Sequence, residues 1–196
     1  MSMKVNDSPL DADALRARLG RRAVVLVGMP GSGKSSIGRR LAQRLGLPFA
    51  DADAEIEEAA GMSISDIFAS RGEGEFRAGE ARVIARLIDE RSRIIATGGG
   101  AFMNADTRAL VGARAVSIWL KAEIPVLLRR VKRKSDRPLL RTPDPEGTLR
   151  RLLSERESTY ARADIVIPSH EGPHEAVVEA IVTALDRHLA AAEATP

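Results

Sequence analysis

The chain has 196 residues, enough for one domain with a sizeable core. Hydrophobic residues make up 44% and charged residues 29%, as in ordinary globular proteins, and the lack of cysteine excludes disulfides, thiolate zinc sites and cysteine nucleophiles. The net charge of +3 fits an anionic substrate, whereas an aromatic content of 3% argues against a surface that stacks nucleic-acid bases. Without a membrane-spanning run or a signal-peptide pattern, we expect a cytoplasmic protein with no membrane and no nucleic-acid partner.

Strand-like and helix-like patterns alternate along the chain. Residues 1–20 are predicted as a partly disordered appendage with a short helix at 11–19, residues 21–192 as a single domain and 193–196 as a tail. The predicted strands are 23–27, 48–50, 94–97, 115–120 and 165–167. The predicted helices are 34–45, 54–60, 64–69, 73–91, 105–111, 125–132, 146–161 and 175–192. This alternation indicates an α/β fold, with helices on both faces of a parallel sheet and a ligand site at the carboxyl ends of its strands.

Residues 28–35, Gly-Met-Pro-Gly-Ser-Gly-Lys-Ser, match the phosphate-binding loop pattern G-x-x-x-x-G-K-[ST]. They lie between a predicted strand and a predicted helix, which is the context that the pattern requires. In such a loop, backbone N–H groups and the helix N-terminus bind phosphate oxygens. A glycine-rich turn that matches by chance is disfavoured, because strand, loop and helix agree. We predict that a nucleotide's phosphates are bound by Gly31, Ser32, Gly33, Lys34, Ser35 and Ser36, with Lys34 reaching the β- and γ-phosphates and Ser35 binding Mg²⁺.

Two carboxylates, Asp51 and Asp53, follow the second predicted strand. In extended chain their side chains would point to the same side. Taken alone, the pair is also compatible with a solvated turn and a helix N-cap. Beside a phosphate loop, the two residues become candidates for organising a metal ion and binding an acceptor hydroxyl.

The third predicted strand ends in Gly98-Gly99-Gly100. This run is either a tight turn or a place where a small ligand lies against bare backbone. Arg77 and Arg156 lie on predicted helices, where an arginine is ordinarily solvated. The three histidines, His170, His174 and His188, lack metal-ligand spacing and are interpreted as surface residues.

The segment 132–147 is rich in charge and proline and poor in apolar residues, so we predict a long mobile loop between two helices. A basic mobile loop that folds over a polyphosphate would neutralise charge and exclude water. The alternatives are a plain solvated loop and a nucleic-acid patch, the latter disfavoured by the lack of interleaved aromatic residues.

Together these segments resemble the shikimate kinase family. The matching pieces run in family order, with family-like spacing, over about 23–189: residues 28–35, Asp51-Ala52-Asp53, Ile67-Phe68, Gly72-Glu73, Glu75-Phe76-Arg77, Gly98-Gly99-Gly100, Arg137-Pro138-Leu139-Leu140, Arg156 and Tyr160-Ala161-Arg162. The phosphate loop alone is shared by very many proteins, but the combination is much more specific. The residues before Ala23 have no counterpart in the shorter members of the family.

The resemblance implies a three-layer P-loop kinase fold, similar to that of nucleoside monophosphate kinases. It implies a five-stranded parallel sheet in the order 2-3-1-4-5, with helices on both faces and a mobile lid at about 132–147. The implied reaction is Mg²⁺-dependent transfer of the ATP γ-phosphoryl group to the 3-hydroxyl of shikimate, a step of chorismate and aromatic amino-acid biosynthesis. We expect a monomer whose partner is this small substrate.

The resemblance also implies roles for single residues. Lys34, Asp53 and Arg137 are implied as catalytic, with Asp53 binding the acceptor hydroxyls as candidate base and Arg137 reaching the transferring phosphate from the lid. Asp51 would support the Mg²⁺ shell through water, and Arg130 would pack on adenine. The substrate carboxylate would be held by Arg77 and Arg156, and its ring would lie against Gly98, Gly99 and Gly100.

Two alternatives of function stay open at this point. Another small-molecule kinase of the same fold, such as a gluconate kinase, would keep the phosphate loop and differ at the acceptor site. A non-catalytic nucleotide-binding protein would be expected to have lost Lys34, Asp53 or Arg137, and all three are present.

Overall fold

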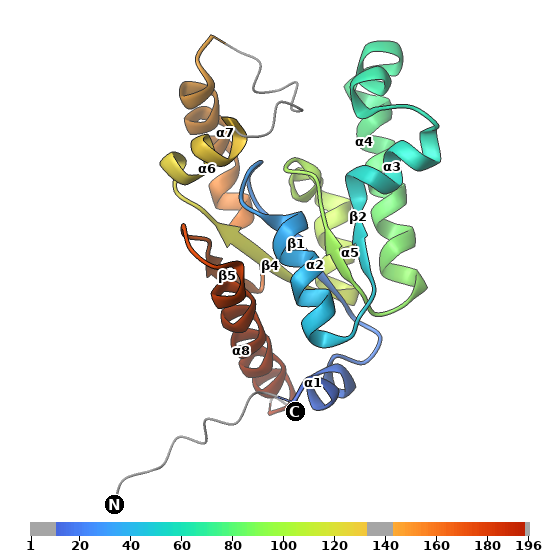
Figure 1. The fold of residues 1–196 in the computed structure, drawn as a ribbon. Coiled ribbons are helices and arrows are strands. Elements are labelled where there is room, and N and C mark those ends of the chain that lie inside the picture. Colours follow the sequence, from blue (N-terminus) through green and yellow to red (C-terminus); the bar gives the residue numbers. More distant parts are fainter. Residues whose placement is uncertain (1–10, 133–142, 195–196) are drawn as a thin grey trace, which may run out of the picture.

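The computed structural model describes residues 11–132 and 143–194, so Arg137 and most of the predicted lid lie outside the described residues. Its strands form one sheet in the order β2-β3-β1-β4-β5, and all neighbouring strands are parallel (Figure 1). The strands are β1 Ala23–Val27, β2 Phe49–Asp51, β3 Ile94–Ala96, β4 Ala115–Lys121 and β5 Ile165–Pro168. The predicted α/β class and strand order are confirmed.

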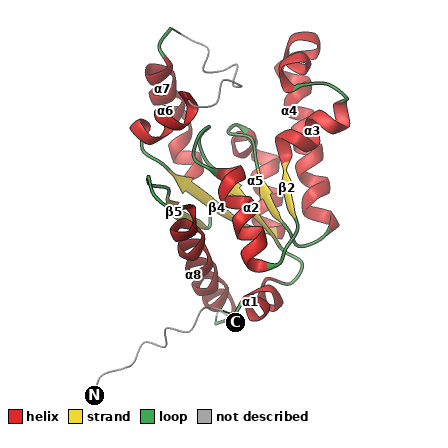
Figure 2. Cartoon of the chain, viewed as in Figure 1, coloured by secondary structure: helices red, strands yellow, loops and turns green. Residues whose placement is uncertain are grey.

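Helices cover both faces of the sheet (Figure 2). They are α1 Ala12–Leu19, α2 Lys34–Leu45, α3 Ala52–Ala60, α4 Ile64–Glu90, α5 Ala105–Arg114, α6 Ile124–Lys132, α7 Pro145–Tyr160 and α8 His174–Glu193, with a 3₁₀ turn at Ala101–Met103. Within the described ranges, no helix is both long enough and apolar enough to cross a membrane.

The central strand β1 contributes to two separate hydrophobic clusters because its side chains alternate between the faces of the sheet. Val25 packs in one cluster with residues of α4, α5, α6 and α7, while Leu26 packs in the other with α1, α2 and α8. A strand that is buried on both faces needs an unbroken apolar sequence, which is what residues 23–27 provide. α1 belongs to this core as well, since Leu15 and Leu19 are buried in the cluster of α2 and α8.

The helices expected at 64–69 and 73–91 are both present within α4, where they meet at a kink at Gly72, whose φ of 80° and ψ of 172° are not helical. Several other helix ends differ from the expected ones by one to three residues. α3 begins at Ala52, two residues before the expected start, because the Asp51 side chain accepts from the backbone N–H of Asp53 and caps the helix. The expectation that Asp51 and Asp53 both lie in extended chain, with their side chains on the same side, was therefore wrong, since Asp53 lies in the first turn of α3.

Candidate active site

The loop between β1 and α2 turns sharply, with positive φ at Gly28 (139°), Gly31 (86°) and Gly33 (99°). At Gly28 a side chain is also excluded by space, because a Cβ would lie 2.8 Å from the Leu120 carbonyl oxygen. Gly33 is the N-cap of α2, and no side chain caps the helix there. The first N–H groups of α2 are therefore left for an anionic ligand, which they favour through both hydrogen bonds and the helix dipole.

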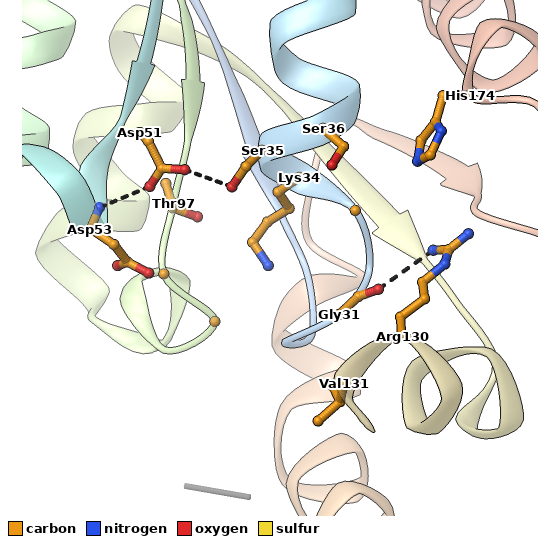
Figure 3. A pocket seen from close by; sticks show the side chains of 13 residues that line it. Gly31, Lys34, Ser35, Ser36, Asp51, Asp53, Thr97, Arg130, Val131 and His174 are labelled. Carbon is orange, nitrogen blue, oxygen red and sulfur yellow. Dashed lines mark hydrogen bonds between the residues drawn. The ribbon is translucent and has the colours of Figure 1, made fainter. Parts of the chain in front are cut away.

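A cavity of about 260 Å³ lies over this loop at the carboxyl ends of β1, β2 and β3 (Figure 3). It is lined by many residues predicted for the site: Gly31, Gly33, Lys34, Ser35, Ser36, Asp51, Asp53, Gly98, Gly99 and Arg130. Three further residues line it that were not predicted: Thr97, Val131 and His174. Four predicted residues, Ser32, Arg77, Gly100 and Arg156, are described but do not line it. Ser32 is fully buried within the loop, where its backbone N–H donates to the Met29 carbonyl at 3.1 Å.

Lys34 is nearly buried, at 7% exposed, although it carries a charge. Its Nζ donates to the carbonyl oxygens of Gly28 at 2.8 Å and of Met29 at 3.0 Å. A buried ammonium needs such partners to offset its desolvation. The loop backbone thereby holds a positive charge in the wall of the cavity, where the phosphates of a nucleotide would lie.

Ser35 and Asp51 form the oxygen-rich side of the cavity. The Ser35 hydroxyl donates to Asp51 Oδ2 at 2.6 Å, and Asp51 Oδ1 accepts from the Asp53 backbone N–H at 3.2 Å. Within the described residues, no group of three or more carboxylates and histidines is placed to hold a metal. Mg²⁺ does not require one, because it is commonly bound by one or two protein oxygens together with substrate phosphates and water. Ser35 and Asp51 therefore fit Mg²⁺ bound together with a nucleotide.

The glycine turn after β3 lies so close to charged side chains that a side chain added there would displace them. A Cβ on Gly98 would lie 2.8 Å from both Asp53 Oδ1 and Glu80 Oε1, and a Cβ on Gly100 would lie 2.6 Å from Arg77 Nη1. The Gly99 carbonyl accepts from Arg156 Nη1 at 3.1 Å. Arg77 on α4 and Arg156 on α7 thus reach the same turn, next to Asp53.

Glu80 is a site residue that the sequence reasoning missed. Its side chain is 4% exposed, and its Oε2 accepts from Arg77 Nη1 at 2.9 Å. Its Oε1 is buried without a hydrogen-bond partner in the described structure. Burial raises the pKa of Glu80, and the nearby Arg77 guanidinium opposes that rise. The spacing of three residues between Arg77 and Glu80 on one helix is the signal that could have revealed the pair.

Tyr160 is the second residue whose place was not foreseen. Its hydroxyl donates to the Gly99 carbonyl, and its ring stacks on Trp119 at a centroid distance of 5.8 Å. Burial is the main reason why the pKa of Tyr160 is raised. The sequence placed Tyr160 in the family pattern without a role, because its contact with Gly99 spans 61 residues.

Arg130 ties α6 to the phosphate loop and to the turn after β5. Its Nη1 donates to the Ser32 carbonyl at 3.3 Å and to Ser169 Oγ at 3.0 Å, and its Nη2 donates to the His170 carbonyl at 2.6 Å. Glu171 in that turn pairs with Arg129 at 2.7 Å. His174 lines the cavity beside this cluster, whereas its sequence context had indicated a surface residue.

Comparisons with known proteins agree with this geometry. The family model for shikimate kinase matches residues 30–186. The chain is 58% identical to the shikimate kinase of Bradyrhizobium diazoefficiens over 193 residues, covering 98% of this chain and 92% of that protein. It is 57% identical to the shikimate kinase of Caulobacter vibrioides over 169 residues, covering 86% of this chain and 84% of the relative.

Solved structures separate the two kinase alternatives. A shikimate kinase from Acinetobacter baumannii in complex with shikimate superposes with a TM-score of 0.83 at 32% identity, covering 95% of this chain and all of the other. A gluconokinase from Sinorhizobium meliloti superposes with a TM-score of 0.61 at 19% identity, covering 88% of this chain and 96% of the other, which is a likeness of fold alone. The family match and the identity over almost the whole chain lead to one conclusion: the chain belongs to the shikimate kinase family.

Proposed function

We propose that this protein transfers the γ-phosphoryl group of ATP to the 3-hydroxyl of shikimate, forming shikimate 3-phosphate and ADP. One observation carries the proposal: Arg77 and Arg156 meet the Gly98–Gly100 turn from two different helices, and Asp53 lies beside this turn in the same cavity as the phosphate loop. Guanidinium groups bind a carboxylate through paired hydrogen bonds. A hydroxy acid anchored in this way would present a hydroxyl to Asp53.

Different cavity residues have different roles in the proposed phosphoryl transfer. Lys34 and the N-terminus of α2 bind and neutralise the β- and γ-phosphates. Mg²⁺, when held at Ser35 and Asp51, supplies further charge neutralisation to the same phosphates. Asp53 orients the acceptor hydroxyl and accepts its proton as the new P–O bond forms, while the bond to the leaving ADP oxygen breaks. Positioning and electrostatics account for most of the catalysis in such a transfer.

Arg137 completes the proposal as the residue that reaches the transferring phosphate. It lies outside the described residues, and its assignment depends on the run Arg137-Pro138-Leu139-Leu140 and on its place in the chain. The residues between α6 and α7 connect the helix that carries Arg130 to the helix that carries Arg156. A closing segment at this position would reach both substrates. We further propose a cytoplasmic enzyme that acts as a monomer.

A panel of acceptors tests the proposed reaction. Purified protein with ATP and Mg²⁺ is expected to release ADP when shikimate is added, and far more slowly with gluconate or with nucleoside monophosphates. Omission of Mg²⁺ should abolish the release. Asp53→Asn is expected to bind ADP normally and to lose turnover by about a hundredfold or more, as expected for the loss of a general base. Equal turnover of gluconate and shikimate would contradict the assignment.

A further inference from the structure

His174 has a place in the cavity that the proposed reaction does not use. It is the first residue of α8 and lines the cavity together with Arg130 and Ser36. Figure 3 shows His174 and Asp53 on opposite sides of the phosphate loop, with Lys34 between them. The end of the cavity at Asp53 is assigned to the acceptor. The opposite end, at His174, is therefore assigned to the part of the nucleotide that lies beyond its γ-phosphate.

Three charged groups, from α2, α6 and α8, act on His174. Arg40 on α2 and Arg130 on α6 act on His174 as positive charges, and Glu175 on α8 acts as a negative one. Glu175 is already paired with Arg40 at 3.2 Å, and Glu171 in the preceding turn is paired with Arg129 at 2.7 Å. Lys34 adds a further positive charge to the same cavity. Arg40 and Arg130 therefore place positive charge near His174, and Glu175, the carboxylate that acts on it, is shared with Arg40.

This environment lowers the pKa of His174, chiefly through burial and then through the charges of Arg40 and Arg130. The imidazole is therefore neutral near pH 7 in the free protein. A nucleotide's phosphate chain in the same cavity would add negative charge close to the ring. The anion favours the imidazolium form, in which both ring nitrogens donate hydrogen bonds.

We propose that His174 is a nucleotide-binding residue that takes up a proton from the solvent when the phosphate chain of ADP or ATP enters the cavity. The proposal deepens the proposed function, on whose nucleotide site it rests. It makes nucleotide affinity dependent on pH, with tighter binding as the pH falls through the pKa of His174 in the complex. If nucleotide binding raises that pKa by one unit, lowering the pH can increase nucleotide affinity by at most about tenfold.

Titration calorimetry with ADP and Mg²⁺, without acceptor, tests the proposal between pH 6 and pH 8. The matched variants are His174→Gln and His188→Gln, because both histidines lie on α8 but His188 does not line the cavity. The terminal phosphate of ADP titrates in the same pH range. The contribution of His174 is therefore measured as the difference in the pH dependence of ADP affinity between wild type and variant. From pH 8 to pH 6, wild type and His188→Gln should gain roughly threefold to tenfold more affinity than His174→Gln. Titrations in two buffers of different ionisation enthalpy should show extra proton uptake in the same two proteins.

Proton NMR gives a readout that is independent of affinity. The chain has three histidines, so the ring signals can be assigned from single variants. The titration midpoint of His174 should move to higher pH when ADP is added. An unmoved His174 midpoint, or the same pH slope in wild type and His174→Gln, would overturn the proposal. Failure of wild type to bind ADP at any pH would overturn the nucleotide site itself, and with it the proposed function.

Discussion

Arg77 and Glu80 form an ion pair in which only one of the two carboxylate oxygens is used. Arg77 Nη1 donates to Glu80 Oε2 at 2.9 Å, whereas Glu80 Oε1 is buried without a hydrogen-bond partner in the described structure. A Cβ on Gly98 would lie 2.8 Å from this free oxygen and from Asp53 Oδ1, so both carboxylates approach the glycine turn. Glu80 therefore fixes the Arg77 guanidinium at the acceptor site and leaves one acceptor oxygen facing the turn.

Glu80→Gln is expected to change how stability depends on pH. Because burial raises the pKa of Glu80, the folded protein binds more protons than the unfolded chain between the ordinary and the raised value. The free energy of unfolding then falls as the pH rises through that window. Glutamine does not titrate, so urea unfolding between pH 4 and pH 7 should show a shallower fall in the variant. Glu73→Gln is the control, since Glu73 also pairs with Arg77 but is 66% exposed. Equal slopes for wild type and Glu80→Gln would show that Glu80 ionises normally.

Arg156→Ala should weaken shikimate binding and leave nucleotide affinity unchanged. Loss of a charge-assisted pair with the substrate carboxylate costs about 1.5–3 kcal/mol. The carboxylate is held in the ground state and in the transition state alike, so KM should rise more than kcat falls. Steady-state kinetics and ADP calorimetry measure both effects. Arg151→Ala on the same helix, which pairs with Glu155 at the surface, should behave as wild type. Collapse of ADP binding with intact shikimate binding would contradict the role of Arg156.

Lys34→Met should act mainly on the rate. The Lys34 ammonium is held by two loop carbonyls, next to the place where the proposed reaction develops phosphate charge. Its loss is expected to lower kcat by about a hundredfold or more, corresponding to roughly 3 kcal/mol of transition-state stabilisation. Single-turnover kinetics with saturating ATP measure the effect, and Lys121→Met, at an exposed pair with Glu157, is the control. Near-normal kcat in a folded variant would mean that Lys34 does not touch the phosphates.

Tyr160→Phe separates positioning from packing. Phenylalanine keeps the ring against Trp119 and removes only the hydroxyl that donates to the Gly99 carbonyl. The lost hydrogen bond is worth about 0.5–1.5 kcal/mol, so we expect KM for shikimate to rise roughly twofold to tenfold with ADP affinity unchanged. If the variant loses stability while KM for shikimate stays constant, the Tyr160 hydroxyl stabilises the fold and does not position the substrate.

The sequence by itself determined the phosphate loop and its flanking elements. The predicted strand at 23–27 and helix at 34–45 coincide with β1 and α2. The reason is local: a strand buried on both faces requires an unbroken apolar run, and the glycines of the loop mark backbone that other residues cannot adopt. The strand order followed from the family resemblance rather than from periodicity, because pairing partners far apart in the chain leave no trace in local spacing.

The tertiary structure decided everything that depends on contacts between distant segments. Asp53 proved to be helical because the Asp51 side chain caps α3, which overrides the extended alternation expected after a strand. The meeting of Arg156 and Tyr160 at the Gly99 carbonyl joins residues 57 and 61 positions apart. The burial of Glu80 and the place of His174 in the cavity likewise come from the packing of whole helices around the sheet. Local sequence chemistry selects the groups, and only the folded chain determines which of them share one cavity and one electric field.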